Sequence, residues 1–294
     1  MKALVYNGVG KIAVEERPQP QIQGPSDAVV KLTHTTICGS DLHIIQGHVP
    51  TVPVGRILGH EGVGVIESVG PNVKSFKVGD HVVISCITTC DSCRFCNRGE
   101  SGMCNSTGGW TLGHTNDGTQ AEYVRIPHAE KSLHHAPKGI DERSLLVLSD
   151  ILPTGLEVGV IKGGVKPGSS IAIIGAGPVG LSALITSQLY SPSHIVVIDR
   201  DQGRLDTAKK MGATFTINPD TAGDIKAATQ DFHGEIDGFD VVIEAVGIPA
   251  TFEACQKLVG KGGAIANVGV HGAKADLHLE SLWGRGIRKL SKRR

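Results

Sequence analysis

One short segment in the second half of the chain constrains its fold more than any other. The apolar run Ile171–Ile174 is followed by the sequence GAGPVG at residues 175–180 and by a helical pattern that reaches Gln188. A G-x-G-x-x-G pattern between a strand and a helix is typical of the first βαβ unit of a doubly wound sheet. Apolar strands and helical segments alternate after it, which favours parallel strands covered by helices on both faces.

The same turn predicts a dinucleotide site, although a glycine-rich turn that binds no nucleotide is the alternative. Gly175 permits the tight turn, Gly177 lets a pyrophosphate approach the helix N-terminus, and Gly180 lets the helix pack on the strand. The next strand ends in Asp199, whose carboxylate can hydrogen-bond ribose hydroxyls and would repel a 2′-phosphate. Arg200 is a competing signal for NADP. We give Asp199 more weight because it stands at the strand end, and NAD is therefore predicted.

The first half of the chain has a different sequence pattern, which predicts short strands between turns and few helices. This pattern predicts a β domain of the barrel or sandwich kind. The change near residues 150–168 predicts two domains, 1–153 and 154–294. The expected strands of the first domain are Ala3–Tyr6, Ile12–Glu15, Ala28–His34, Val63–Val69, His81–Ser85 and Ala121–Ile126.

Four of the seven cysteines crowd into one short segment, as Cys90-x2-Cys93-x2-Cys96-x7-Cys104. This spacing suits a closed tetrahedral zinc site with four thiolate ligands. The alternatives are an iron–sulfur cluster and incidental cysteines. Because a closed site has no open position, we predict a structural zinc that staples a loop with little core of its own.

Charge and hydropathy exclude several classes of protein. Lys and Arg total 29, as do Asp and Glu, so the formal net charge is zero and bulk electrostatic binding of nucleic acid is disfavoured. No apolar run reaches the roughly 18 residues of a membrane span, and the N-terminus lacks the features of a signal peptide. We expect a cytoplasmic protein that binds neither nucleic acid nor membranes.

Two further fragments carry candidate metal ligands: Cys38, in the sequence CGSDLH, and His60, in the sequence GHE. Each is weak alone, because a lone cysteine or histidine more often packs in a core. We expect such ordinary packing of Cys86 and Cys255. Together with the four-cysteine loop and the G-x-G-x-x-G turn, the two fragments follow one order over nearly the whole chain. In this combination the chain resembles the zinc-dependent medium-chain alcohol dehydrogenases, nearest their secondary-alcohol dehydrogenase branch.

The resemblance implies a GroES-like β domain followed by a Rossmann domain. It also implies a catalytic zinc in addition to the structural one. Cys38 and His60 match its first two ligands, and Asp150 matches the third, where many relatives have cysteine. Glu61 matches a second carboxylate that lies near the metal. The implied reaction is reversible oxidation of a primary or secondary alcohol to an aldehyde or ketone, with hydride transfer to NAD.

The resemblance also assigns roles around the reacting atoms. Ser40 and His43 match a proton relay, and Asp41 is expected to orient the loop of metal ligands. Trp110 falls where relatives line the substrate pocket, although ordinary packing of a loop aromatic is an equal alternative. The residues expected to bind NAD are Thr154, Gly175, Gly177, Pro178, Val179, Gly180, Asp199, Arg200, Arg204 and Val268.

Two rival functions remain open at this stage: a polyol or sugar dehydrogenase of the same superfamily, and a zinc-binding chain with little activity. The second rests on the C-terminus, where Arg288, Lys289 and a basic end replace the apolar alternation expected of a sixth strand. We therefore predict a shortened chain without the sixth strand of the Rossmann sheet and without the return into the first domain. The homo-oligomer that the resemblance implies would be weakened.

Overall fold

The computed structural model describes residues 1–291 and divides into two units. The first comprises Met1–Asp150, and the second begins at Ile151. The sequence analysis placed this boundary between residues 153 and 154. Among the described residues, no helix combines the length and the apolar composition needed to cross a membrane.

The first unit is built mainly of antiparallel strands. Its larger sheet buries alternate residues of β9, Val124 and Ile126, against Val30 and Ile66 in one apolar core. This sheet has the order β10 (Leu133–His135), β6 (His81–Ile84), β5 (Gly62–Val69), β3 (Ala28–Thr35) and β9 (Tyr123–Ile126). Smaller sheets pair β2 (Ile12–Glu16), β1 (Lys2–Tyr6) and β4 (Arg56–Ile57), and β7 (Ile87–Thr88) with β8 (Gly109–Trp110). Its helices are α1 (Gly39–Ile45), α2 (Ala129–Ser132) and α3 (Glu142–Leu146).

The second unit is a parallel sheet, confirming the Rossmann-like fold predicted from the glycine-rich turn. Counted along the chain, the strand order is 3-2-1-4-5-6, which is the Rossmann order. The strands are β13 (Phe215–Ile217), β12 (His194–Ile198), β11 (Ser170–Ile174), β14 (Phe239–Glu244), β15 (Val259–Asn267) and β16 (Arg288–Ser291). β15 ends at Asn267, so residues 268–270 form a loop beyond the sheet.

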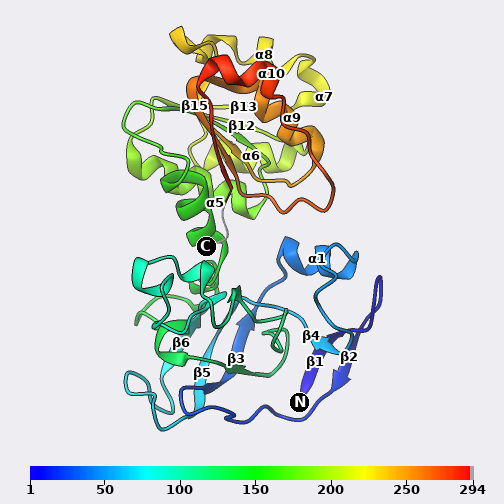
Figure 1. The fold of residues 1–294 in the computed structure, drawn as a ribbon, viewed down its shortest axis with the longest axis vertical. Helices are drawn as coiled ribbons and strands as arrows, with labels where there is room; N and C mark the ends of the chain where they lie inside the picture. The colour runs from blue at the N-terminus through cyan, green and yellow to red at the C-terminus, as the bar shows by residue number, and fades with distance from the viewer. Residues whose placement is uncertain (292–294) are drawn as a thin grey trace. The chain divides into compact units, whose positions relative to one another are not determined.

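Helices cover both faces of this sheet, as Figure 1 shows. Leu184 and Leu205 belong to the core on one face, and Phe252 and Leu282 belong to the core on the other. Burial on both faces explains why all five residues of β11 are buried and why the strand is continuously apolar. The helices that supply these residues are α5 (Pro178–Ser187) and α6 (Gln202–Lys210) on the first face, and α9 (Pro249–Leu258) and α10 (Leu279–Leu282) on the second.

The predicted absence of a sixth strand is wrong. Residues Arg288–Ser291 form β16, which pairs in parallel with β15 from Ala264 to Asn267. An edge strand needs only backbone partners, so exposed Arg288 and Lys289 side chains are tolerated where a central strand would require apolar ones. The ammonium of Lys289 also lies 4.8 Å from the ring centroid of Phe252. Part of the basic end, residues 292–294, lies outside the described residues.

Candidate functional site

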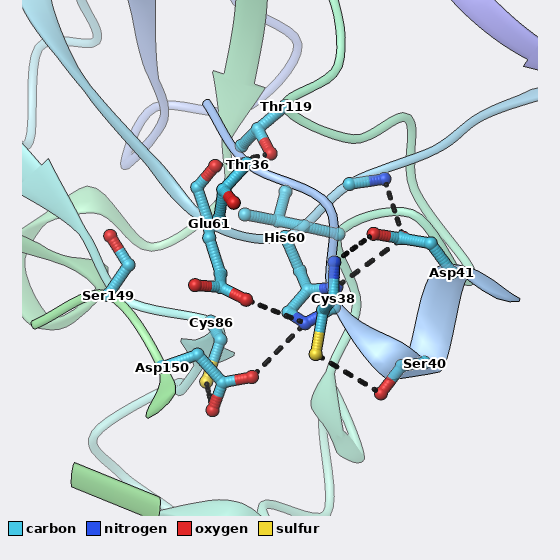
Figure 2. Close-up of polar contacts among 12 residues, drawn as sticks. Thr36, Cys38, Ser40, Asp41, His60, Glu61, Cys86, Thr119, Ser149 and Asp150 are labelled. Atoms are coloured by element: carbon cyan, nitrogen blue, oxygen red, sulfur yellow. Dashed lines mark hydrogen bonds and ion pairs between the residues drawn. The ribbon is translucent and has the colours of Figure 1, made fainter. Parts of the chain in front are cut away.

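Four predicted metal-site residues from distant parts of the first unit come together in the structure (Figure 2). Cys38 lies between β3 and α1, His60 and Glu61 immediately precede β5, and Asp150 ends the unit. One ligand atom from each residue lies within 4.8 Å of the others. His60 Nε2 is 3.1 Å from Asp150 Oδ2 and 3.8 Å from Glu61 Oε1.

Asp41 links the two chain segments that carry Cys38 and His60. Its carboxylate accepts hydrogen bonds from the backbone N–H of Cys38 at 2.9 Å and of Gly59 at 3.3 Å. Asp41 Oδ1 also lies 3.9 Å from His60 Nδ1. Gln120, which sequence reasoning did not single out, donates to Asp41 at 2.9 Å. Asp41 thus holds the segments that carry Cys38 and His60 next to each other.

The charges around His60 fit a bound cation. Burial alone would lower the pKa of His60, but Cys38, Asp41 and Glu61 outweigh it and raise the pKa above its ordinary value. Three carboxylates lie within 4 Å of this one imidazole, and its side chain is only 3% exposed. Like charges held together away from water need a compensating positive charge. A thiol, an imidazole and a carboxylate are also the ligand types of catalytic zinc sites.

Cys86 is a residue that the sequence analysis treated as ordinary packing. Its thiol donates to Asp150 Oδ1 at 3.5 Å, while the other oxygen of Asp150 faces His60. The backbone N–H of Cys86 also bonds the carbonyl of Ser149 at 3.0 Å. Cys86 therefore helps to set the orientation of the Asp150 carboxylate (Figure 2).

The predicted relay residues lie next to the metal-site residues on α1. Ser40 Oγ is 3.8 Å from Cys38 Sγ. His43 is further along the same helix, and its Nδ1 is 3.1 Å from His48 Nδ1. Partial burial and the neighbouring His48 lower the pKa of His43. No hydrogen bond joins Ser40 to His43 within residues 1–291, so a relay between them needs a bridging group.

Trp110 lies near the His60 cluster but is also packed into the first unit. Its ring meets His60 edge to face at 5.9 Å and stacks on His114 at 4.7 Å. It also borders the apolar cluster that contains Ile44 and Leu58. Both interpretations made from the sequence, pocket wall and loop packing, are consistent with this position.

The four cysteines of the loop form the second metal-site candidate. Sulfur–sulfur distances are 3.5 Å for Cys90–Cys104 and for Cys93–Cys96, and 3.9 Å for Cys90–Cys96. Four sulfurs bound tetrahedrally to one zinc ion at 2.3 Å would lie about 3.8 Å apart. The loop is therefore shaped for a closed zinc site.

The thiol pKa values in this loop also favour metal binding. Burial raises the pKa of Cys104, but hydrogen bonds from Thr107 and from the Cys90 backbone outweigh it and lower the pKa to about 7. Hydrogen bonds from Ser92 lower the pKa of Cys90, whereas burial raises that of Cys96. Because thiolates are the metal-binding form, lowered pKa values reduce the cost of deprotonation.

The glycine-rich turn of the second unit borders a pocket of about 880 Å³. Gly175 has φ +101°, and a Cβ on Gly180 would lie 1.8 Å from the Gly175 carbonyl oxygen. A Cβ on Gly177 would meet no heavy atom within 4 Å, so the protein itself does not require glycine there. A ligand that approaches the N-terminus of α5 would require it.

Asp199 and its neighbours line the same pocket, but they are held differently. Asp199 accepts hydrogen bonds from the backbone N–H of Ala176 at 2.7 Å and of Asp201 at 2.9 Å. Arg200 instead forms an ion pair with Asp220 at 2.8 Å, and its side chain is 78% exposed. Arg204 lines the pocket, with a nitrogen 4.0 Å from Asp199.

The other predicted cofactor residues do not line this pocket. Pro178 and Val179 begin α5, Thr154 ends α4 (Ile151–Thr154), and Val268 follows β15. The remaining pocket walls come from residues 219–225 and from residues after β14, including Val246, which the sequence analysis did not select. The apolar strand followed by Gly247 was the available signal for this turn.

Comparison with known proteins matches this two-part organisation. Residues 24–138 match the alcohol dehydrogenase GroES-like domain family, and residues 178–291 match the zinc-binding dehydrogenase family. The chain is 39% identical over 277 residues to zinc-type alcohol dehydrogenase B of Aspergillus flavus, with 92% of this chain and 64% of that relative covered. It is 34% identical over 296 residues to an alcohol dehydrogenase of Cupriavidus necator, with 96% and 80% covered.

A solved structure agrees with the whole described fold. Zinc-dependent alcohol dehydrogenase 2 of Streptococcus pneumoniae, in its apo form, superposes with a TM-score of 0.92 at 47% identity. The superposition covers 99% of this chain and 82% of that one. With both halves matched in sequence and structure, the chain belongs to the zinc-dependent medium-chain alcohol dehydrogenase family.

Proposed function

We propose that this chain transfers hydride between an alcohol, primary or secondary, and NAD, giving an aldehyde or ketone. The observation that carries the proposal is the convergence of Cys38, His60 and Asp150, with Glu61 beside them, around the buried His60 ring. These three side chains would hold the catalytic zinc, and Cys90, Cys93, Cys96 and Cys104 would hold a structural one. A bound zinc ion supplies a Lewis acid that makes an alcohol more acidic.

The residues around Cys38 would position the substrate and remove its proton. The Ser40 hydroxyl lies beside the Cys38 sulfur, where it can accept a hydrogen bond from an alcohol bound next to the ligands. His43 would take the proton onward toward solvent, because its lowered pKa keeps the ring neutral and able to accept it. Trp110 would form an apolar wall that limits water near His60.

The preference for NAD rests on the environment of Asp199 and Arg200. The Asp199 carboxylate is held at the pocket by two backbone amides, where it would meet the ribose hydroxyls and repel a 2′-phosphate. Arg200 already has Asp220 as its partner, which reduces its availability to a phosphate. The bound nicotinamide supplies the hydride acceptor, and the protein supplies position and charge.

The test is an activity assay with the zinc-loaded protein. Primary alcohols, secondary alcohols and polyols would be offered with NAD and with NADP, and reduced cofactor would be followed by absorbance. We expect turnover of simple alcohols with NAD and loss of turnover in Cys38→Ser and Asp150→Asn. Asp117→Asn, on the exposed surface of the same unit, is the matched control.

Elemental analysis of the same preparation tests the metal assignment. We expect two zinc ions per chain, with one lost in Cys38→Ser. Absence of turnover with every alcohol in protein that holds zinc and binds NADH would contradict the proposed function. A stoichiometry of one zinc or less in active protein would contradict the two-site assignment.

A further inference from the structure

A buried polar network lies behind the loop that follows β15. Its centre is Glu244, the last residue of β14, whose side chain is 0% exposed. Glu244 Oε1 accepts hydrogen bonds from the N–H groups of Val246 at 3.0 Å and Gly247 at 2.8 Å, and from the Thr251 hydroxyl at 2.7 Å. This oxygen holds the turn that leads from β14 into α9.

The second oxygen of Glu244 faces the other loop. Oε2 has no hydrogen-bond partner within the described part of the chain, but His271 Nε2 lies 3.5 Å away. A Cβ on Gly269 would lie only 2.4 Å from Oε2, so the carboxylate lies directly against the loop backbone. A buried carboxylate oxygen is costly to leave unpaired, which favours a histidine N–H directed at it.

The neighbouring contacts fix the proton of His271. Its Nε2 is 2.9 Å from Asn267 Oδ1, and the Asn267 side-chain amide donates to the Gly269 carbonyl at 3.0 Å. The amide therefore presents its oxygen to His271, and Nε2 must be the protonated nitrogen. The Phe252 ring meets the imidazole edge to face at 6.0 Å. The Nε2–H thus bonds the Asn267 oxygen, and its 3.5 Å approach to Glu244 Oε2 is an electrostatic contact and not a second hydrogen bond.

The loop held by this network is at the sheet edge where a dinucleotide binds. The backbone N–H groups of Val268 and Gly269 donate to the Glu244 carbonyl at 2.8 and 3.0 Å. In a sheet of this order, one mononucleotide lies at strands one to three and the other at strands four to six. The pocket that contains Asp199 is lined by residues that follow strands one to four and includes none of residues 268–270, which follow the fifth strand, β15.

We propose that Glu244, Asn267 and His271 act as a clamp that positions the backbone of residues 268–270 against the nicotinamide half of the cofactor. The proposal rests on the proposed function, since it assumes a nicotinamide dinucleotide. The three are positioning residues. With the clamp intact, the loop is ordered before the cofactor arrives, so binding does not bear the cost of ordering it.

The test compares NADH with ADP-ribose, which has the same adenosine, pyrophosphate and second ribose but lacks the nicotinamide ring. NADH affinity is measured by fluorescence titration, and ADP-ribose affinity by competition. For His271→Leu we expect NADH binding to weaken about tenfold, with ADP-ribose binding unchanged. His271→Gln places an amide N–H near the position of Nε2 and is expected to stay within about threefold of wild type.

The matched control is His194→Leu, at the amino end of β12 and therefore at the opposite edge of the sheet from the loop. It is expected to leave both affinities unchanged. Unchanged NADH affinity in His271→Leu, or an equal loss for NADH and ADP-ribose, would contradict the clamp and leave the proposed function unaffected. If the wild-type protein bound ADP-ribose but not NADH, the proposed function would be wrong, and the clamp with it.

Discussion

Replacing Cys86 by alanine tests whether the support of a ligand matters as much as the ligand itself. Cys86 is 4% exposed, and its thiol donates to one oxygen of Asp150 while the other oxygen lies 3.1 Å from His60 Nε2. Without the thiol, the carboxylate can rotate away from the position where it meets His60. We expect Cys86→Ala to weaken zinc binding at the site of Cys38, His60 and Asp150 (the Cys38 centre) without affecting the four-cysteine loop.

The size of the effect follows from the chemistry of the bond. Loss of a hydrogen bond that orients a metal ligand typically costs about 10- to 100-fold in metal affinity. A thiol is a weak donor and the distance is long at 3.5 Å, so the lower end applies. We therefore expect about a tenfold rise in the zinc dissociation constant, or about 1.4 kcal/mol.

The assay is competition between the protein and a fluorescent zinc chelator, with stoichiometry followed throughout. Cys86→Ser keeps a hydroxyl donor and should stay near wild type. Cys255→Ala removes another fully buried cysteine, far along the chain in the second unit, and controls for general destabilisation. A zinc affinity within twofold of wild type in Cys86→Ala would refute the reasoning, as would an equal loss in Cys255→Ala.

Three further predictions concern the relay and the cofactor site. Asp199→Ser should raise the ratio of kcat/KM for NADP to that for NAD about ten- to a hundredfold, with some loss of stability because two backbone amides lose their acceptor. A wild-type preference for NADP would contradict it. His48→Gln removes one of the two causes that lower the pKa of His43, after burial, so that pKa should rise. Since oxidation needs neutral His43, the rising limb of kcat/KM against pH should move to higher pH, and an unmoved limb would exclude His43 as the base. Gly180→Ala should cost about 1–3 kcal/mol of unfolding free energy through its clash, whereas Gly177→Ala, with open space at its Cβ, should keep its melting temperature and weaken only NADH binding.

Features that depend on local chemistry could be predicted from the sequence. The G-x-G-x-x-G turn works through backbone conformation and close approach within six residues, so its strand, helix and pocket edge follow from the letters alone. The four cysteines lie within fifteen residues of one another, so their proximity does not depend on the rest of the fold. The Cys38, His60 and Asp150 set came from resemblance, because their approach depends on three distant segments.

The features that could not be predicted depend on partners far along the chain. The sixth strand was missed because Arg288 and Lys289 lack the apolar pattern expected of a strand. Residues 288–291 form a strand because the free edge of β15 offers them backbone hydrogen-bond partners. Cys86 looked like a packed thiol until Asp150, 64 residues later, was placed beside it. His271 was one of thirteen histidines, and nothing in the sequence relates it to the buried carboxylate of Glu244.

The two donor sets of the first unit would not treat all metal ions alike. Four thiolates form a soft, polarizable environment that copper(I) can enter as readily as zinc, whereas one thiolate with an imidazole and a carboxylate also suits iron(II) or nickel(II). An excess of copper should therefore damage the loop, and a shortage of zinc should leave the Cys38 centre open to the wrong metal. A single chain would then fail in two distinguishable ways, by losing its folded loop or by keeping its shape with an inactive ion.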